Sequence, residues 1–183
     1  MKNMSLAHIA LGANLPSPAG PPEATLAAAA ERLASLGSVV ARSSLYSTAP
    51  VGAPAGIDQP RFLNAVVALE TTLAPFELLG AVLLIEHEFG RDRTGGVRNG
   101  PRTLDLDILL YGDLVLSEAG LEIPHPRFAQ RAFVLIPLHE IAPNLRDPRS
   151  GRTVAQLLAA LAPSAAEPAP SVVPVESALW RST

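Results

Sequence analysis

The sequence lacks cysteine altogether, and this absence excludes both a disulfide framework and a metal site built on thiolates. The sequence also has no excess of basic residues: it contains 14 lysine and arginine residues and 17 acidic residues, which give a formal net charge of −3. A general nucleic-acid or anionic-membrane binder would show a broad basic surface, so we expect neither as a partner. The expected partners are small molecules.

Long hydrophobic runs are missing as well. The N-terminal apolar stretch is too short for a signal peptide, and no segment approaches the roughly 20 residues that cross a bilayer. Together with the missing cysteines, this predicts a cytoplasmic protein. The common nucleotide-binding loops are also absent, since neither G-x-x-x-x-G-K-[ST] nor a strand-linked G-x-G-x-x-G occurs.

The composition predicts one folded domain followed by a tail. With 48% hydrophobic and 17% charged residues, a chain of this length buries one good core, which we place in residues 1–162. Residues 163–183 are rich in Ala, Pro, Ser and Val and contain the single tryptophan, Trp180. We expect this tail to be flexible or to dock loosely.

Residues 104–111 combine an acidic and an apolar face. The side-chain period of an extended strand places Asp105 and Asp107 on one face. The opposite face is expected to join the core and consists of Leu104, Leu106, Ile108 and Leu110. Two carboxylates a few ångströms apart repel by roughly 4 kcal/mol at an effective dielectric constant of about 20, so a cation between them is expected. Oxygen-only ligands favour Mg²⁺ or Mn²⁺, which usually also bind substrate phosphates.

Four arginines lie in the glycine-containing loop that leads into this strand, namely Arg91, Arg93, Arg98 and Arg102. Their guanidinium groups could hold phosphate oxygens bidentately. A solvated loop and a solvated strand face are the alternative interpretations of the two features. Because the arginines lead directly into the acidic strand, the combination favours metal-assisted phosphate chemistry over those alternatives.

Hydrophobic periodicity predicts a mixture of strands and helices. The expected strands cover residues 6–11, 39–46, 61–71, 104–111 and 114–116. The expected helical segments cover residues 22–36, 75–89, 135–141 and 154–161. The first two should end at Gly37 and Gly90. Residues 48–60 are rich in Gly and Pro and too long for a simple connection, so we predict a functional loop there.

Further candidate residues lie outside the acidic strand. Phe62 and Asn64 share one strand face, where a ring and a carboxamide could stack on and hydrogen-bond to a flat heterocycle, although an ordinary strand is the alternative. Glu86 borders the apolar stripe of its helix and is either a ligand-binding group or a partner in an ion pair with the arginine loop. His125 is held between two prolines, which suits a phosphate-binding imidazole or a simple turn.

The acidic strand belongs to a longer motif, G-P-R-T-L-D-L-D-I-L-L-Y, at residues 100–111. Further blocks are L-G-A-N-L (11–15), S-S-L-Y-S-T-A-P-V-G (43–52), D-Q-P-R-F-L-N-A-V (58–66), I-P-H-P-R (123–127) and R-A-F-V-L-I-P-L (131–138). In this order the blocks closely resemble the 6-hydroxymethyl-7,8-dihydropterin pyrophosphokinase family. The resemblance covers about residues 6–145.

The resemblance implies transfer of a diphosphate group from ATP to the hydroxymethyl group of 6-hydroxymethyl-7,8-dihydropterin, with release of AMP, in folate biosynthesis. It implies an α+β fold with a ferredoxin-like central antiparallel sheet and helices packed on it in three α/β/α layers. We expect a monomer. Two Mg²⁺ ions are implied, held by Asp105 and Asp107 and bridging the phosphates of ATP and the attacking hydroxyl.

The family's roles carry over position by position. Arg91 and Arg102 would act in catalysis together with Asp105 and Asp107. The positions implied in ATP binding are Glu86, Arg91, Arg93, Arg98, Arg102, Ile108, His125 and Arg131. The positions implied in pterin binding are Thr48, Val51, Phe62, Asn64 and Phe133. Arg93 and Arg98 match a loop that closes over bound substrates in this family.

The sequence departs from familiar family members at several positions. Phe62 stands where some members have tyrosine, which keeps the stacking face but removes a hydroxyl. Other departures that affect the nucleotide end and loop closure are Ala49, Leu83, Asn99 and Glu122. Two other classes remain as alternatives. One is another D-x-D enzyme, such as a sugar-nucleotide transferase, and the other is a non-catalytic small-molecule-binding domain.

Overall fold

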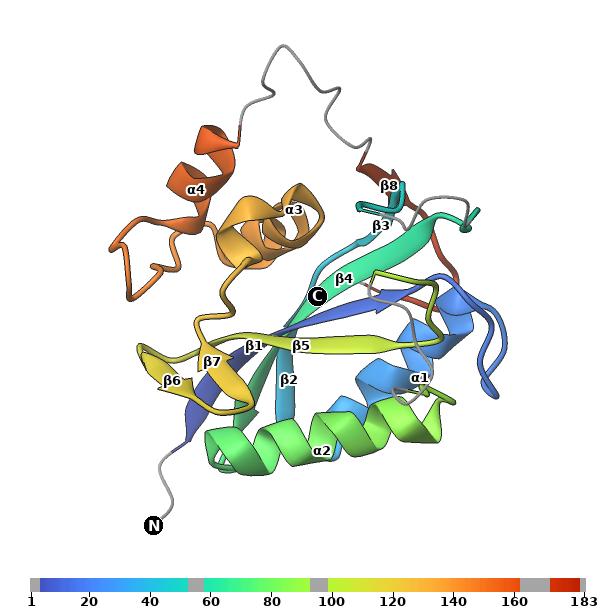
Figure 1. The fold of residues 1–183 in the computed structure, drawn as a ribbon, viewed down its shortest axis with the longest axis horizontal. Helices are drawn as coiled ribbons and strands as arrows, with labels where there is room; N and C mark the ends of the chain where they lie inside the picture. Colours follow the sequence, from blue (N-terminus) through green and yellow to red (C-terminus); the bar gives the residue numbers. More distant parts are fainter. Residues whose placement is uncertain (1–3, 53–57, 93–98, 162–171, 182–183) are drawn as a thin grey trace.

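A computed structural model of the chain describes residues 4–52, 58–92, 99–161 and 172–181. In these residues a central antiparallel sheet lies between two layers of helices (Figure 1). The first elements in chain order are β1 (Ser5–Ala13), α1 (Pro22–Ala34), β2 (Ser38–Arg42), β3 (Leu45–Thr48), β4 (Phe62–Thr71), α2 (Pro75–Glu88) and β5 (Asp105–Tyr111). The others are β6 (Leu116–Glu118), β7 (Leu121–Ile123), the 3₁₀ turn η1 (Phe128–Gln130), α3 (Ala132–Ile141), α4 (Val154–Ala160) and β8 (Val173–Val175).

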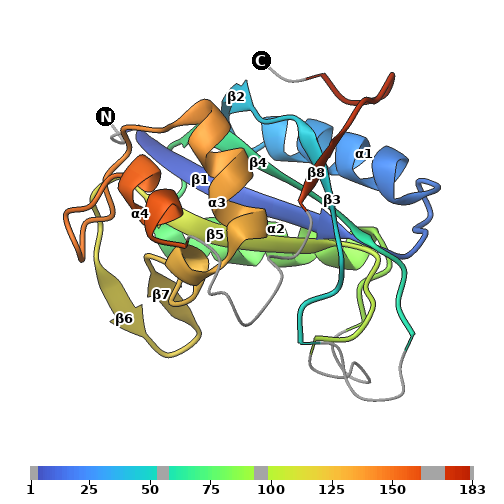
Figure 2. The same ribbon diagram turned by 90° about the horizontal axis from the view of Figure 1, so that it is seen from above.

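The main sheet has the strand order β5-β1-β4-β3-β8, with β2 paired to the second half of β4, and its pairs are antiparallel. If β2 and β3 are taken as one interrupted strand, β1 to β5 follow the βαββαβ order of a ferredoxin-like fold. Helices α1 and α2 cover one face, and α3 and α4 cover the other (Figures 1 and 2). The predicted α+β architecture in three layers is confirmed. Within the described ranges, no helix is both long and apolar enough to span a bilayer.

Two hydrophobic cores hold the layers together. The core beneath α1 and α2 includes Ile9, Val67 and Leu106 from three neighbouring strands. The core beneath α3 is smaller and includes Val66 and Leu135. Strands β1 and β4 are covered on both faces, and they carry buried apolar side chains on both. Their ends therefore carry site residues on a fixed support.

Strand β5 contains a β-bulge that the sequence did not predict. Consecutive residues of β1 pair with Ile108 and Leu110, so Leu109 has no pairing partner on that strand. The extra residue places Leu110 in the core beneath α3, whereas strict alternation predicted it on the opposite face. The bulge comes after the acidic pair, and Asp105 and Asp107 therefore keep the predicted common face.

The strand predicted over residues 39–46 is interrupted at Ser43. The Ser43 backbone N–H donates to the carbonyl of Val66 at 3.0 Å, and its hydroxyl accepts the Val66 N–H at 3.0 Å. The side chain thus replaces a backbone acceptor, and the chain shifts between β2 and β3. Helix α1 ends at Ala34, before Gly37, which we predicted as its end. Gly37 instead lies against the neighbouring chain, where a Cβ would be 2.0 Å from the carbonyl oxygen of Glu70. Glycine permits this close approach of the two chains.

Part of the C-terminal tail docks on the sheet, within the segment for which we predicted flexibility or loose docking. Strand β8 pairs with β3, and Trp180 is buried, with 5% of its surface exposed. The indole N–H of Trp180 donates to the carbonyl of Ser43 at 2.7 Å. Local composition could not predict this docking, because it depends on a sheet edge more than 120 residues earlier in the chain. Residues 162–171 lie outside the described residues.

The burial of His8 is expected to make the protein less stable as the pH falls. Its side chain is 2% exposed, and its Nδ1 has no hydrogen-bond partner in the part of the chain that the structure describes. Burial lowers the pKa of His8 from 6.5 to about 4, so the unfolded chain binds a proton at higher pH than the folded protein does. The contribution of neutral His8 to the free energy of unfolding is therefore fully present above pH 6.5 and is lost as the pH falls toward 4.

Between pH 7 and pH 5, we expect His8 to lower the free energy of unfolding by about 2 kcal/mol. Urea unfolding of the wild type and of His8→Leu at both pH values measures this loss. The other histidines are common to both proteins, so their contributions cancel in the difference. An equal pH dependence in the two proteins would contradict the prediction.

Candidate functional site

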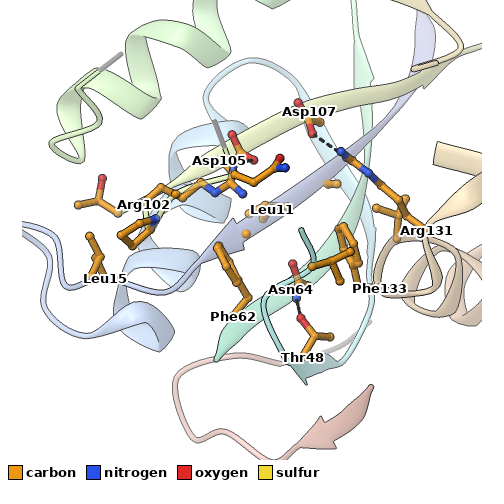
Figure 3. Close-up of a pocket in the computed structure, with 18 of the residues that line it drawn as sticks. Leu11, Leu15, Thr48, Phe62, Asn64, Arg102, Asp105, Asp107, Arg131 and Phe133 are labelled. Carbon is orange, nitrogen blue, oxygen red and sulfur yellow. Dashed lines mark hydrogen bonds and ion pairs between the residues drawn. The ribbon is translucent and has the colours of Figure 1, made fainter. Parts of the chain in front are cut away.

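A cavity of about 680 Å³ opens where β1, β4 and β5 meet the arginine loop and the start of α3 (Figure 3). Its volume lies within the roughly 300–1,000 Å³ typical of small-molecule sites. Most of the predicted site residues line it, namely Thr48, Val51, Phe62, Asn64, Arg91, Arg102, Asp105, Asp107, His125, Arg131 and Phe133. The fold therefore brings residues from distant parts of the sequence to one cavity.

Of the other predicted residues, Arg93 and Arg98 lie outside the described residues, and Glu86 and Ile108 do not line the cavity. Glu86 is buried in α2, and its carboxylate accepts the backbone N–H of Leu106 at 2.8 Å, which fixes the start of β5. Ile108 packs in the core on the α2 side of the sheet. The predicted contacts of Glu86 and Ile108 with ATP therefore stay predictions.

Two arginines hold Asp105. Its carboxylate accepts from Nη1 of Arg102 at 3.0 Å and lies 3.4 Å from Nη2 of Arg91. Arg91 also donates to the carbonyl of Leu104 at 3.1 Å. The backbone N–H of Arg102 donates to Oδ1 of Asn14 at 2.8 Å. These contacts fix two guanidinium groups at one end of the acidic strand.

Asp107 faces a histidine and a third arginine. Its Oδ2 lies 3.9 Å from Nε2 of His125 and 3.8 Å from Nη1 of Arg131. The Nδ1 of His125 accepts the backbone N–H of Arg127 at 3.1 Å, so in the neutral ring Nε2 carries the proton. Burial raises the pKa of Asp107, and the negative charge of Asp105 raises it further. Burial also lowers the pKa of His125 and of Arg131.

The opposite part of the cavity is neutral. Asn64 lies between Phe62 and Phe133 (Figure 3), and its Nδ2 donates to Oγ1 of Thr48 at 2.8 Å. Both polar side chains are buried. A Cβ at Gly12 would lie 3.2 Å from Oδ1 of Asn64, so glycine leaves room for the amide. A carboxamide in a fixed orientation between two rings can recognise the polar edge of a flat heterocycle.

Each aromatic ring also contacts one of the arginines. The guanidinium carbon of Arg102 lies 5.1 Å from the centre of the Phe62 ring, and that of Arg131 lies 5.5 Å from the centre of the Phe133 ring. Such distances are typical of cation–π contacts. The same two guanidinium groups face the aspartates, so they lie between the charged and the neutral parts of the cavity.

A hydrogen-bond network connects three loops around the cavity, and the sequence did not predict it. The Nδ2 of Asn14 donates to Gln59 at 3.4 Å, and the Nε2 of Gln59 donates to the carbonyl of Asn99 at 3.0 Å. Asn99 in turn donates to the carbonyl of Gly52 at 3.2 Å. Asn14 and Gln59 both lie within motifs of the family resemblance, which was the one sequence signal for them.

The donor set fits magnesium better than a metal enclosed by protein ligands. Among the residues that the structure describes, no group of three or more His, Cys, Asp or Glu side chains could hold a metal ion. Asp105 and Asp107 supply two carboxylates on one face, and Mg²⁺ usually completes its shell with water and substrate phosphates. A metal that arrives with a nucleotide is compatible with this arrangement.

Comparison with known proteins finds close relatives. Residues 8–143 match the family model described as 7,8-dihydro-6-hydroxymethylpterin-pyrophosphokinase (HPPK). A 2-amino-4-hydroxy-6-hydroxymethyldihydropteridine pyrophosphokinase of Pseudomonas aeruginosa is 51% identical over 153 residues, which cover 84% of this chain and 90% of that protein. A mitochondrial folate synthesis bifunctional protein of Arabidopsis thaliana is 49% identical over 109 residues, which cover 60% of this chain and 19% of that protein.

Solved structures show the same architecture. The HPPK-DHPS protein of Plasmodium falciparum, in a crystal structure with pteroate, superposes with a TM-score of 0.68 and 15% sequence identity. The match covers 87% of this chain and 45% of that protein, so this chain spans less than half of it. At this identity the similarity shows the fold alone.

Proposed function

This chain belongs to the 7,8-dihydro-6-hydroxymethylpterin-pyrophosphokinase family, and we propose that its cavity transfers diphosphate from ATP to the hydroxymethyl group of 6-hydroxymethyl-7,8-dihydropterin, releasing AMP. The observation that supports this most strongly is that one cavity combines a carboxylate pair with a carboxamide between two aromatic rings. The related plant protein is named a folate synthesis bifunctional protein, and we propose the same pathway for the reaction of this chain. We further propose a cytoplasmic monomer.

The neutral end of the cavity would bind the pterin. The rings of Phe62 and Phe133 would stack on its faces, and the amide of Asn64 would read its polar edge. Because Thr48 accepts one Nδ2 proton, the amide keeps its second proton and its oxygen for the ligand. This orients the hydroxymethyl group toward the aspartates.

The charged end would bind the phosphates of ATP. Arg91, Arg102 and Arg131 would exchange their contacts with the aspartates for phosphate oxygens and absorb the charge that develops on the departing AMP. The buried Nε of Arg102 has no hydrogen-bond partner within the described ranges, so a shift of this guanidinium toward a bound phosphate would let the Nε donate to it. The protonated Nε2 of His125 would donate to phosphate.

Asp105 and Asp107 would hold two Mg²⁺ ions, which neutralise phosphate charge and lower the pKa of the attacking hydroxyl. The chain's own residues then hold the hydroxyl and the phosphate in reach of each other. Since phosphoryl transfer depends mainly on positioning and charge neutralisation, no covalent intermediate with the protein is needed.

An assay with the full chain, ATP, Mg²⁺ and the pterin alcohol tests this function. We expect one AMP per pterin diphosphate, no activity after EDTA treatment, and recovery with excess Mg²⁺. A sugar-nucleotide transferase would instead use a nucleotide sugar and release a nucleoside diphosphate. A non-catalytic binding domain would bind the pterin without turnover and without dependence on Mg²⁺.

Replacing Thr48 with valine is expected to weaken pterin binding selectively. Valine keeps the shape but removes the acceptor for Asn64, and an unsatisfied buried donor costs about 1–3 kcal/mol. We therefore expect the pterin KM to rise by about tenfold or more. The KM for ATP should change by less than about twofold, since Thr48 faces the neutral end. Initial rates with each substrate varied measure both constants. Thr48→Ser keeps the hydroxyl and serves as the control, and an equal rise of both KM values would contradict the assignment.

A further inference from the structure

Strand β3 connects the C-terminal end of the described chain to the neutral end of the cavity. One edge of β3 pairs with β4, and the other edge pairs with β8. Thr48, the last residue of β3, holds the amide of Asn64, and the chain continues directly into the cavity wall at Ala49 and Val51. The position of β3 therefore determines the position of the group that would read the pterin.

Residues 172–181, called the C-terminal segment below, fasten β3 at two places. Strand β8 pairs along it, with Val175 opposite Leu45 and Val173 opposite Ser47. Trp180 donates its indole N–H to the carbonyl at the junction of β2 and β3. The guanidinium of Arg42, in β2, lies 5.9 Å from the centre of the indole. The segment thus pairs with β3 from Leu45 to Ser47 and also contacts the chain just before β3 at Ser43.

A second contact ties the same segment to α1. The hydroxyl of Ser177 donates to the carboxylate of Glu23 and also accepts the backbone N–H of Trp180 at 2.9 Å. Within β8, Pro174 has no N–H, so this strand is a poor template for further pairing. The C-terminal segment therefore supplies the edge strand of the sheet, and it covers the edge of β3 that would otherwise have unpaired backbone groups.

Other contacts keep β3 attached to the domain when the segment is loosened. Glu140 of α3 accepts from the hydroxyl of Tyr46 at 2.9 Å and from the backbone N–H of Ser44 at 2.8 Å. Arg61 donates to the carbonyl and the hydroxyl of Ser47. Loss of the segment's anchor should therefore shift β3 without unfolding the domain.

We propose that the C-terminal segment is a positioning element for the heterocyclic substrate, acting through β3, Thr48 and Asn64. The proposal rests on the proposed function. The groups that face the phosphates, Asp105, Asp107 and His125, lie on β5 and on the loop after β7, which the segment does not pair with. The segment should therefore affect the pterin and not ATP.

Full-length Trp180→Ala tests the proposal, and Trp180→Phe provides a milder change that keeps the aromatic packing but removes the indole donor. We expect the pterin KM to rise about tenfold in Trp180→Ala and about threefold in Trp180→Phe, in line with the loss of one buried hydrogen bond and its packing. The ATP KM should stay within about twofold. Leu179→Ala, at a neighbouring side chain that is 59% exposed, should match the wild type. Equal changes in both KM values, or none in either variant, would overturn the proposal.

Hydrogen exchange of the wild type supplies a readout that does not depend on a mutation. Coupling between two sites is reciprocal, so saturating 6-hydroxymethylpterin should slow amide exchange in residues 172–181 by a similar factor of about ten. If the wild type forms AMP but the pterin leaves this exchange unchanged, the inference is wrong while the proposed function stands. If the wild type forms no AMP, the proposed function is itself wrong.

Discussion

Asp107→Asn is expected to lower kcat on the order of a thousandfold while the protein stays folded. Asparagine has the shape of aspartate but no charge, so it cannot hold Mg²⁺ beside Asp105. It also leaves His125 and Arg131 without their nearby carboxylate. Since burial and the neighbouring charge raise the pKa of Asp107, the wild-type carboxylate is under electrostatic strain. Its neutralisation should not reduce stability.

Single-turnover kinetics and urea unfolding measure the two halves of this prediction. Asp113→Asn is a matched control, because it removes the same charge from an exposed turn outside the cavity. The control should retain the kcat of the wild type. If Asp107→Asn kept more than about a tenth of that kcat, the carboxylate pair would not be the metal site.

Arg102→Ala is the second variant with a large expected effect. The Arg102 guanidinium contacts Asp105 and the ring of Phe62, so it acts at the boundary between the two substrates. Its loss should lower kcat by about 10²–10³-fold, the range seen when one preorganised donor is removed from a transition state. Arg102→Lys keeps the charge but not the planar fork, and we expect a loss of about tenfold.

The control for this series is Arg32→Ala, which breaks an exposed ion pair with Glu88, and neither residue lines the cavity. Exposed ion pairs contribute little to stability because water and salt screen them, so this variant should keep its fold and its activity. Rates of AMP formation at saturating substrates compare the three proteins. Equal rates in Arg102→Ala and Arg32→Ala would show that Arg102 has no role in the reaction.

The sequence predicted the parts of the site that depend on local periodicity. The common face of Asp105 and Asp107 follows from alternation in a strand, and the bulge after Asp107 does not disturb it. Alternation failed at Leu110 because a bulge depends on the pairing strand. The break at Ser43 was also missed, since its cause is a hydrogen bond to Val66 on another strand.

Contacts between distant segments were beyond the reach of local patterns. The docking of Trp180 depends on the open edge of β3, and the loop network depends on Asn14 meeting Gln59 across the cavity. The role of Glu86 could not be decided from local patterns either. Its position on α2 allowed either a ligand or a structural role, and only the fold reveals its hydrogen bond to the start of β5.

The central claim is that the cavity moves two phosphoryl groups of ATP together. The most direct measurement uses ATP carrying ³²P at the γ position, with the pterin alcohol and Mg²⁺, and separates all labelled products. The account predicts that the label appears in the pterin diphosphate with an equal amount of unlabelled AMP, and that both products form about a thousandfold more slowly in Asp107→Asn. Label in a pterin monophosphate accompanied by ADP would contradict it.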